Sequence, residues 1–157
     1  MAIEKLKVAV FMAQKPEGEE EEMVDGCPAA TQDIAVNIKN RQKAIEVANY
    51  GPMNPALANE SYWAKHAGVF GVPVAEAKKS RCANCAAFIQ TTKMIDCIKK
   101  GLDAGPEADA IEAAANLGYC EIFDFKCAGE RTCTAWVYGG PITDANMKKE
   151  SNNGKTK

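Results

Sequence analysis

Cysteines crowd into one short stretch of this 157-residue chain. They occupy positions 27, 82, 85, 97, 120, 127 and 133, so six of the seven lie between Arg81 and Cys133. The number is odd, and the chain begins without the basic and apolar regions of an export signal, so a fold held together only by disulfides is not expected. Several thiolates gathered in one place repel each other and lose hydration, and a bound metal removes that cost. The cysteines therefore predict a metal-binding core.

The spacing of the cysteines bears on the kind of metal centre. Cys82 and Cys85 are two residues apart, so a short turn brings both sulfurs to one centre. The further ligands come from a more widely spaced set: Cys97, Cys120, Cys127 and Cys133. A structural zinc site normally uses two short pairs, or one pair with nearby histidines, and His66 is the single histidine. A cubane iron-sulfur cluster needs cysteines alone and accepts them from separate loops, so it is favoured; zinc and free or disulfide-linked thiols are the alternatives.

Aromatic residues accompany the candidate ligands. Within a few positions of them lie Phe88, Phe123, Phe125, Trp136 and Tyr138. An aromatic shell keeps water away from sulfur and iron, which protects a cluster and tunes its reduction potential. We therefore expect an apolar wall around the metal.

Three short motifs in residues 80–141 combine a cysteine with an aromatic residue. They are Cys82-Ala-Asn-Cys85 followed by Phe88, Cys120-Glu-Ile-Phe123, and Cys133-Thr-Ala-Trp136. These motifs resemble those of the high-potential iron-sulfur proteins, whose pattern is C-x-N-C with an aromatic three positions on, then C-x-aliphatic-F, then C-x-small-W. The resemblance implies that the four motif cysteines hold a [4Fe-4S] cluster and that the three motif aromatics form its apolar wall.

The remaining cysteines have no counterpart in that family. We expect Cys97 to be a small buried residue on a helix and interpret Cys127 as a loop thiol. A disulfide between Cys97 and Cys127 is the alternative for this pair. Cys27, just ahead of Pro28, is expected to be structural because nothing near it completes a nucleophile site.

Two further expectations concern aromatic residues outside the ligand motifs. The family that the motifs resemble also shields its cluster with a ring from elsewhere in the chain. The candidates for that ring are Tyr50, Tyr62 and Trp63. His66, which follows two of these rings, is expected to be a packed surface residue rather than a proton donor or metal ligand.

Hydrophobic periodicity predicts an α+β fold, in which a small irregular cluster domain of short strands and loops is flanked by two or three helices and an N-terminal strand arm. We divide the chain into a strand arm with an acidic linker (1–26), a helical segment (27–79), the cluster-binding domain (80–141) and a polar tail (142–157). The arm contains a β-prone run over 5–12, which needs a sheet edge to pair with and so predicts docking to partner subunits.

Helical patterns occur in four places. They cover residues 32–49, 74–80, 86–101 and 107–116. In the first, Thr31 is the expected cap, and Ile34, Ile38, Ile45 and Ala48 recur at helical spacing, as on one face of a helix. Gly101 and Gly118 are expected to end the last two helices.

Charge, hydropathy and motifs exclude several functions. Nineteen Lys and Arg against 21 Asp and Glu give a net charge of −2, so no basic field favours nucleic acid. No apolar run approaches the roughly 20 residues that span a bilayer, so no membrane partner is expected. No nucleophile motif or phosphate loop is present, so we expect no enzymatic activity. The expected location is the cytoplasm or a virion.

Three functions fit these patterns. The first is a [4Fe-4S] structural or docking subunit of a phage particle or similar assembly, whose cluster staples the fold. It draws on a resemblance to small proteins of tailed bacteriophages of aquatic bacteria in the runs Asn49-Tyr-Gly-Pro-Met-Asn-Pro55 and Ala77-Lys-Lys-Ser-Arg-Cys82. The second is a soluble one-electron carrier, as in the high-potential family. The third is a zinc-stapled binding module.

Overall fold

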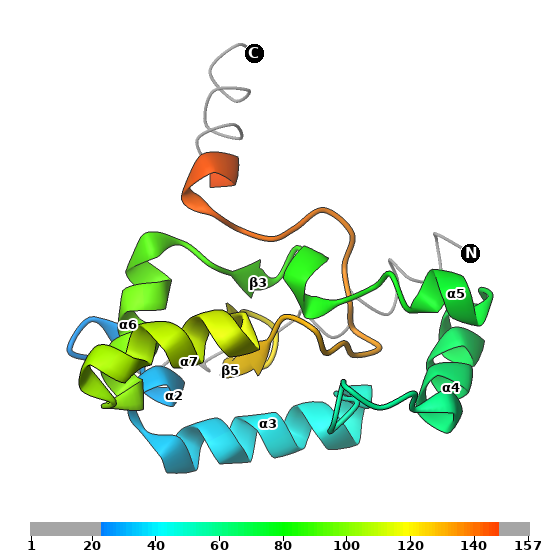
Figure 1. Cartoon of the computed structure of the whole chain (residues 1–157), viewed down its shortest axis with the longest axis horizontal. Helices are drawn as coiled ribbons and strands as arrows, with labels where there is room; N and C mark the ends of the chain where they lie inside the picture. Colours follow the sequence, from blue (N-terminus) through cyan, green and yellow to red (C-terminus); the bar gives the residue numbers. More distant parts are fainter. Residues whose placement is uncertain (1–22, 148–157) are drawn as a thin grey trace, which may run out of the picture.

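Short helices and two small antiparallel sheets make up residues 23–147, the part of the chain that the computed structural model describes (Figure 1). The helices are α2 (Ala29–Gln32), α3 (Ile34–Ala48), α4 (Glu60–Phe70), α5 (Val74–Ala77), α6 (Thr92–Leu102) and α7 (Ala108–Ala115), with 3-10 turns η1 (Cys82–Asn84) and η2 (Gly105–Glu107). The strands are β1 (Met23–Val24), β2 (Cys27–Pro28), β3 (Phe88–Ile89), β4 (Leu117–Cys120) and β5 (Phe125–Ala128). The α+β class is confirmed, with more helices than the two or three expected. The predicted strand over 5–12, the acidic run and residues 148–157 lie outside the described residues.

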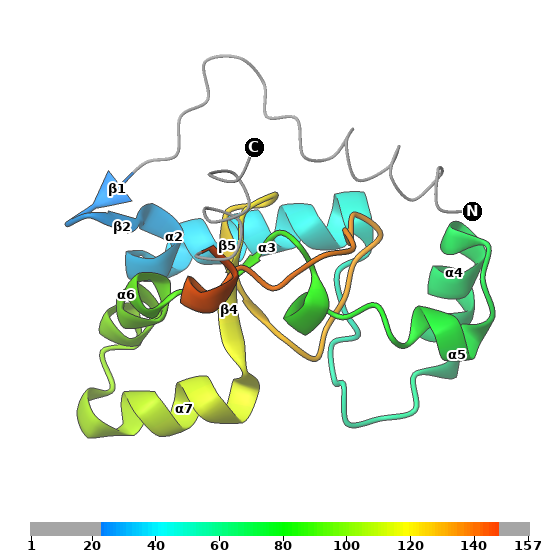
Figure 2. The same ribbon diagram turned by 90° about the horizontal axis from the view of Figure 1, so that it is seen from above.

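The loops that carry the cysteines lie in the middle of the molecule. Figure 2 shows α4 and α5 at one end and α6 and α7 at the other, and α3 runs along one side. The main apolar core surrounds the cysteines, and a smaller one lies between α4 and α5. The α4–α5 end contributes Phe70 to the main core, which also takes Ala44 and Ala48 from α3.

β4 is the central strand of the larger sheet. Cys120 on β4 pairs with Phe88 on β3 and with Phe125 on β5, both in antiparallel register. Gly118 also lies in β4, where a Cβ would overlap the ring of Phe88. This sheet thus positions one predicted ligand next to two aromatic side chains.

Two predicted helices are present with shorter bounds. The helix expected over 74–80 is α5, and the one expected over 107–116 is α7. The prediction that Gly118 ends the latter is wrong. Asn116 ends it instead, in the left-handed conformation with φ 47°, which Asn tolerates better than most residues.

The N-terminus of α3 differs from the prediction by two residues. Asp33, not Thr31, is the cap: its carboxylate accepts the backbone N–H groups of Ala35 and Val36 at 2.9 and 3.4 Å. Thr31 lies in α2, where its hydroxyl donates to the Pro28 carbonyl. At 15 residues α3 is longer than α4, α6 or α7, and within residues 23–147 no helix combines the length and apolarity needed to cross a bilayer.

The buried face of α3 is made of alanines. Ala44 and Ala48 are fully buried and Ile45 packs against the core, whereas Ile34 and Ile38 are 74% and 58% exposed. The expected face is therefore correct at Ile45 and Ala48 and wrong at Ile34 and Ile38. The Ala48 carbonyl accepts the backbone N–H of Thr134 at 2.7 Å. The small alanine side chains allow this close approach. It is the C-terminal half of α3 that packs on the core.

The prediction of a helix over 86–101 is wrong in its first half. Phe88 lies in strand β3, and the chain stays extended up to Thr91, which caps α6 with its hydroxyl. The cause is a backbone partner far along the chain: Gln90 donates to the Ile142 carbonyl at 2.7 Å, and Ile142 donates to that of Phe88 at 2.8 Å. Tertiary pairing here outweighs helix propensity.

The sequence patterns did not predict α4. This helix begins after Asn59 and ends at Gly71, both in the left-handed conformation with φ 49° and 64°. Trp63 and Ala67 pack against Ala77 of α5. The two helices form a small apolar unit beside the cysteine-bearing loops.

Candidate metal centre

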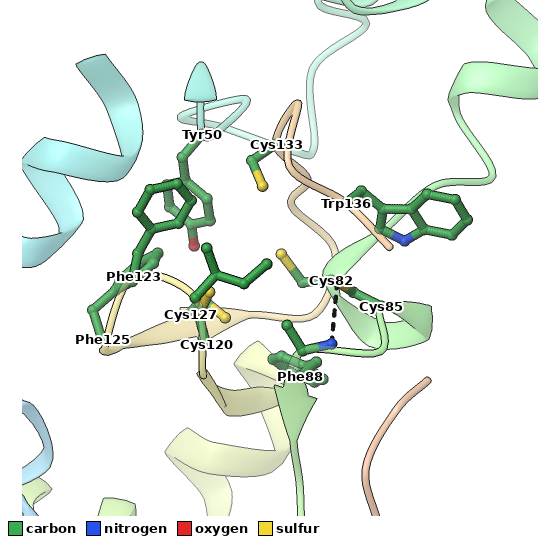
Figure 3. Close-up of a pocket in the computed structure, with 12 residues that line it drawn as sticks. Tyr50, Cys82, Cys85, Phe88, Cys120, Phe123, Phe125, Cys127, Cys133 and Trp136 are labelled. Carbon is green, nitrogen blue, oxygen red and sulfur yellow. Dashed lines mark hydrogen bonds between the residues drawn. The ribbon is translucent and has the colours of Figure 1, made fainter. Parts of the chain in front are cut away.

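Five cysteine side chains face one cavity in the middle of the molecule (Figure 3). They are Cys82, Cys85, Cys120, Cys127 and Cys133. The other residues that line the cavity are Tyr50, Ala87, Phe88, Ile122, Phe123, Phe125 and Trp136. The fold thus brings together all four cysteines predicted as ligands and all three aromatics predicted to form the wall.

The predicted ligands come from separate local structures. Cys82 begins η1 and Cys85 follows its end, so one tight turn presents both sulfurs. Cys120 is the last residue of β4, and Cys133 lies in the loop after β5. The Cys82 N–H donates to the Arg131 carbonyl at 2.6 Å, which joins the turn to that loop.

Backbone N–H groups point at the sulfur of Cys85. The amide nitrogens of Ala87 and Val137 lie 3.5 and 3.4 Å from its Sγ. Hydrogen bonds of this kind stabilise a thiolate more than a thiol. Cys85 is therefore prepared to carry negative charge.

Cys120 and Cys133 accept similar hydrogen bonds. The sulfur of Cys120 accepts from the backbone of Phe123 and Ile122, and that of Cys133 from the backbone of Ala135. Each bond closes a short turn just after the cysteine. Such turns orient the sulfur toward the cavity and supply the amide donors that tune iron-sulfur centres.

Burial raises the pKa of several of these thiols. The affected residues are Cys85, Cys120, Cys127 and Cys133, and neighbouring sulfurs raise the pKa of each further. The N–H donors act in the opposite direction at Cys85, Cys120 and Cys133. Without a cation the thiols stay neutral, and their ionisation requires compensating positive charge in the cavity.

Cys127 is a member of the cavity that the sequence patterns missed. It lies on β5 rather than in a loop and is 3% exposed, so its interpretation as a loop thiol is wrong. Phe125 and Cys127 alternate with the half-buried Lys126, and alternate residues of a strand share a face. That alternation is the signal in the sequence that indicates an inward-facing thiol.

Tyr50 is the outer aromatic that reaches the cavity, and Tyr62 and Trp63 do not line it. The Tyr50 ring is 4% exposed and meets Phe125 edge-on, with ring centres 4.9 Å apart. Its hydroxyl accepts the backbone N–H of Ala128 at 3.2 Å. Burial raises the pKa of this phenol, so the hydroxyl remains neutral inside the cavity.

Trp136 is held at the cavity wall by its indole N–H. This group lies 2.9 Å from both the Arg81 carbonyl and Oδ1 of Asn84. Arg81 directly precedes the Cys82–Cys85 turn and Asn84 lies within it, so the ring and the turn are fixed together. The indole face is thereby left to the apolar interior.

The cysteines outside the cavity form a disulfide with each other. Cys27 on β2 is bonded to Cys97 on α6. The alternative pairing of Cys97 with Cys127 is therefore wrong, whereas Cys97 is buried on a helix as expected and in addition carries this disulfide. The structural role expected for Cys27 is confirmed. The two residues are 70 positions apart, and no local pattern indicates their proximity.

His66 is fully buried, which corrects the expectation of a surface residue. Its ring lies among those of Tyr62, Trp63 and Phe70, and its Nε2 is 3.3 Å from Oγ1 of Thr132. It does not line the cavity. Its position agrees with a packing role rather than metal binding.

Within residues 23–147, no three or more His, Cys, Asp or Glu side chains are arranged so as to hold a metal ion. Comparisons of the chain with family models, with curated proteins and with solved structures find no match.

Proposed function

We propose that the protein binds a [4Fe-4S] cluster through Cys82, Cys85, Cys120 and Cys133, and that the cluster staples the surrounding loops together. The observation that carries this proposal is the cavity itself, in which four buried cysteines and the half-buried Cys120 line one apolar space. A cluster supplies the positive charge that lets buried thiols ionise.

The donor set fits a cluster. The lining contains cysteines and apolar or aromatic residues, with neither a histidine nor a carboxylate. Each cysteine of a cubane binds a different iron, so the ligands surround a body rather than a point. Backbone N–H groups directed at Cys85, Cys120 and Cys133 match the hydrogen bonding that such thiolates receive.

A stapling role follows from where the ligands lie. The loop after β5, residues 129–141, has little regular secondary structure. Bonds from Cys82, Cys85, Cys120 and Cys133 to one cluster would tie this loop to η1 and β4. Because the site exists only where these segments meet, the binding free energy of the cluster would add to that of folding. We therefore expect cluster loss and loss of this region's structure to occur together.

Anaerobic reconstitution with iron and sulfide tests the proposal. The full chain should take up about four iron atoms and show a broad absorbance near about 400 nm. Cys85→Ala should lose both, whereas the matched control Cys97→Ala, which removes a cysteine outside the cavity, should keep them. One zinc and no colour would support the zinc-stapled module instead.

A second function, one-electron transfer, has an observation of its own. Trp136 lines the cavity and also a groove on the surface, together with Tyr138, Glu76 and Lys79. Tyr138 is 87% exposed, so a short aromatic path leads from the cavity to solvent. A carrier requires reversible voltammetry of the reconstituted protein and fast electron exchange with a partner, and a redox-inert cluster contradicts it.

The proposal also includes docking within an assembly such as a phage particle. Its support in the described residues is the exposed pair Ile34 and Ile38 on one face of α3, a feature of surfaces that contact other subunits. Purified particles should contain the protein, and I34S/I38S should reduce its incorporation. Ile111→Ser, which changes an exposed residue on α7, is the matched control. Particles without the wild-type protein contradict docking.

A further inference from the structure

Two of the cysteines that line the cavity lie on the same pair of strands. Cys120 of β4 pairs with Phe125 of β5. Cys127 of β5 pairs with Gly118 of β4. In an antiparallel sheet, paired residues share a face, and so do alternate residues of one strand. The register therefore makes Cys120 and Cys127 diagonal neighbours on one face, a position in which Cβ atoms are typically no more than about 7–8 Å apart.

This shared face is the one that borders the cavity. Phe88 of β3 pairs with Cys120 on its other side, so it belongs to the same face. Each side chain that the register places there lines the cavity: Phe88, Cys120, Phe125 and Cys127. Figure 3 shows the sulfurs of both cysteines entering the cavity from the β4–β5 side. Two sulfurs therefore reach the same part of the cavity.

Cys120 is the more exposed member of this pair. It is half-buried at the end of β4, whereas Cys127 is 3% exposed and lies within β5. A cysteine must be deprotonated to bind a metal, so a ligand that water reaches is the one more readily protonated and released. A buried thiol next to it is in position to replace it.

The other predicted ligands do not belong to these strands. Cys82 and Cys85 share one turn, and Cys133 lies in the loop after β5. In a cubane cluster each cysteine binds its own iron. The strand register therefore associates Cys127 with the iron that Cys120 would bind.

We infer that Cys120 and Cys127 are alternative ligands of the same iron. The inference rests on the proposed function. In the exchange, the bond between iron and the sulfur of Cys120 breaks and a bond to the sulfur of Cys127 forms, while the proton of the Cys127 thiol passes to Cys120. The number of bound thiolates and the total charge stay the same, so the exchange requires no oxidant or reductant.

Anaerobic reconstitution of alanine variants of the full chain tests the exchange. Cys120→Ala and Cys127→Ala should each take up as much iron as the wild-type protein, because either sulfur is sufficient. The double variant C120A/C127A should lose the iron and the colour. Cys133→Ala, which removes a ligand outside the paired strands, is the matched control and should lose them as well. Iron analysis and the visible spectrum measure all four variants.

A serine variant covers the case in which Cys120→Ala does not fold. Cys120→Ser nearly keeps the size of the thiol, and resonance Raman spectroscopy reports whether sulfur or oxygen binds the iron. The stretching bands of Cys120→Ser should keep the pattern of a site with sulfur ligands only, because Cys127 binds in place of the serine. They should lose that pattern in C120S/C127A. Oxygen ligation in Cys120→Ser itself would overturn the inference.

Loss of iron from Cys120→Ala alone would also overturn the inference, and so would iron retained in C120A/C127A, since three cysteines would then be enough. Iron retained in Cys82→Ala or Cys133→Ala would assign the exchange to a different iron and contradict the pairing with Cys120. A wild-type protein that takes up no iron would refute the proposed function itself. Failure of the inference alone is recognised because the wild-type protein then still binds iron.

Discussion

At the scale of single residues, Gly101 shows how one absent side chain brings two helices together. It lies within α6 rather than ending it, because α6 continues to Leu102. A Cβ at this position would overlap the backbone carbonyl oxygen of Thr31 in α2. The carbonyl belongs to the main chain, so it cannot turn aside as a flexible side chain would. Close approach of α2 and α6 therefore depends on this glycine.

Gly101→Ala should lower the free energy of unfolding by about 1–3 kcal/mol, the usual cost of overpacking. Gly68→Ala is the matched control, since Gly68 also lies in a helix but has open space around its Cα. There alanine should be neutral or should stabilise by about 0.5–1 kcal/mol through helix propensity. Urea unfolding of the wild-type protein and of both variants gives the two changes in unfolding free energy. Equal effects at the two glycines would contradict the close contact.

Asp33 makes a second prediction at this scale. Its carboxylate accepts two backbone N–H groups at the start of α3, so Asp33→Ala should cost about 1 kcal/mol of unfolding free energy. Asp33→Asn should stay close to the wild-type value, because Asn is an equally good cap. Thermal unfolding by circular dichroism measures both. If Asp33→Ala unfolds like the wild-type protein, the capping interaction is not significant.

At the scale of elements, the disulfide joins the first sheet to α6. Cys27 follows the turn between β1 and β2, and Cys97 lies in the middle of α6. The side chain of Gln32 adds a second link, because its Nε2 donates to the Cys97 carbonyl at 2.8 Å. β2, α2 and α6 therefore form one cross-linked unit.

The double variant C27A/C97A should lose about 2–4 kcal/mol of unfolding free energy, as expected when a cross-link that closes a long loop is removed. Dithiothreitol should destabilise the wild-type protein by a similar amount and leave the double variant unchanged. Denaturant unfolding with and without the reductant measures both effects. If dithiothreitol left the unfolding free energy of the wild-type protein unchanged, that result would argue against this disulfide in solution.

At the scale of the whole molecule, the cavity lies between the end formed by α4 and α5 and the end formed by α6 and α7 (Figure 2). Its cysteines belong to the segments that connect these two ends. The unit that contains the Cys27–Cys97 disulfide lies outside the cavity, so it would not depend on the proposed cluster. The loop that carries Cys133 is held by non-covalent contacts with distant segments, such as the two backbone hydrogen bonds between Thr132 and Gly51. Cluster loss should therefore affect the two regions unequally.

Removal of the cluster by oxidation and chelation should raise the amide exchange rates of residues 129–137 by at least about tenfold, which corresponds to about 1.4 kcal/mol. Exchange in α6, next to the disulfide, should change much less. Hydrogen-deuterium exchange followed by mass spectrometry compares the two regions in one experiment. Uniform protection before and after cluster removal would contradict the stapling role.

Part of the cavity follows from the sequence alone. The C-x-x-C turn at Cys82 and Cys85 is local, and so are the short motifs that place Phe123 after Cys120 and Trp136 after Cys133. Local spacing determines such turns wherever the segment lies, whereas the expectation that the three turns share one site came from the resemblance of their motifs to those of a known family. Local sequence also determines α7, whose alanine-rich run favours a helix in any setting.

Other features depend on partners far along the chain, and only the tertiary structure decided them. Cys27 forms a disulfide with Cys97, 70 positions along the chain. Phe88 lies in a strand rather than in the predicted helix because Ile142 pairs with it. The choice of Tyr50 among three rings, and the entry of Cys127 into the cavity, likewise depend on how β5 packs. The sequence by itself determined the chemistry of the cavity, because spacing within a turn is local. The tertiary structure decided which distant groups complete it, because long-range pairing and burial are set by the whole fold.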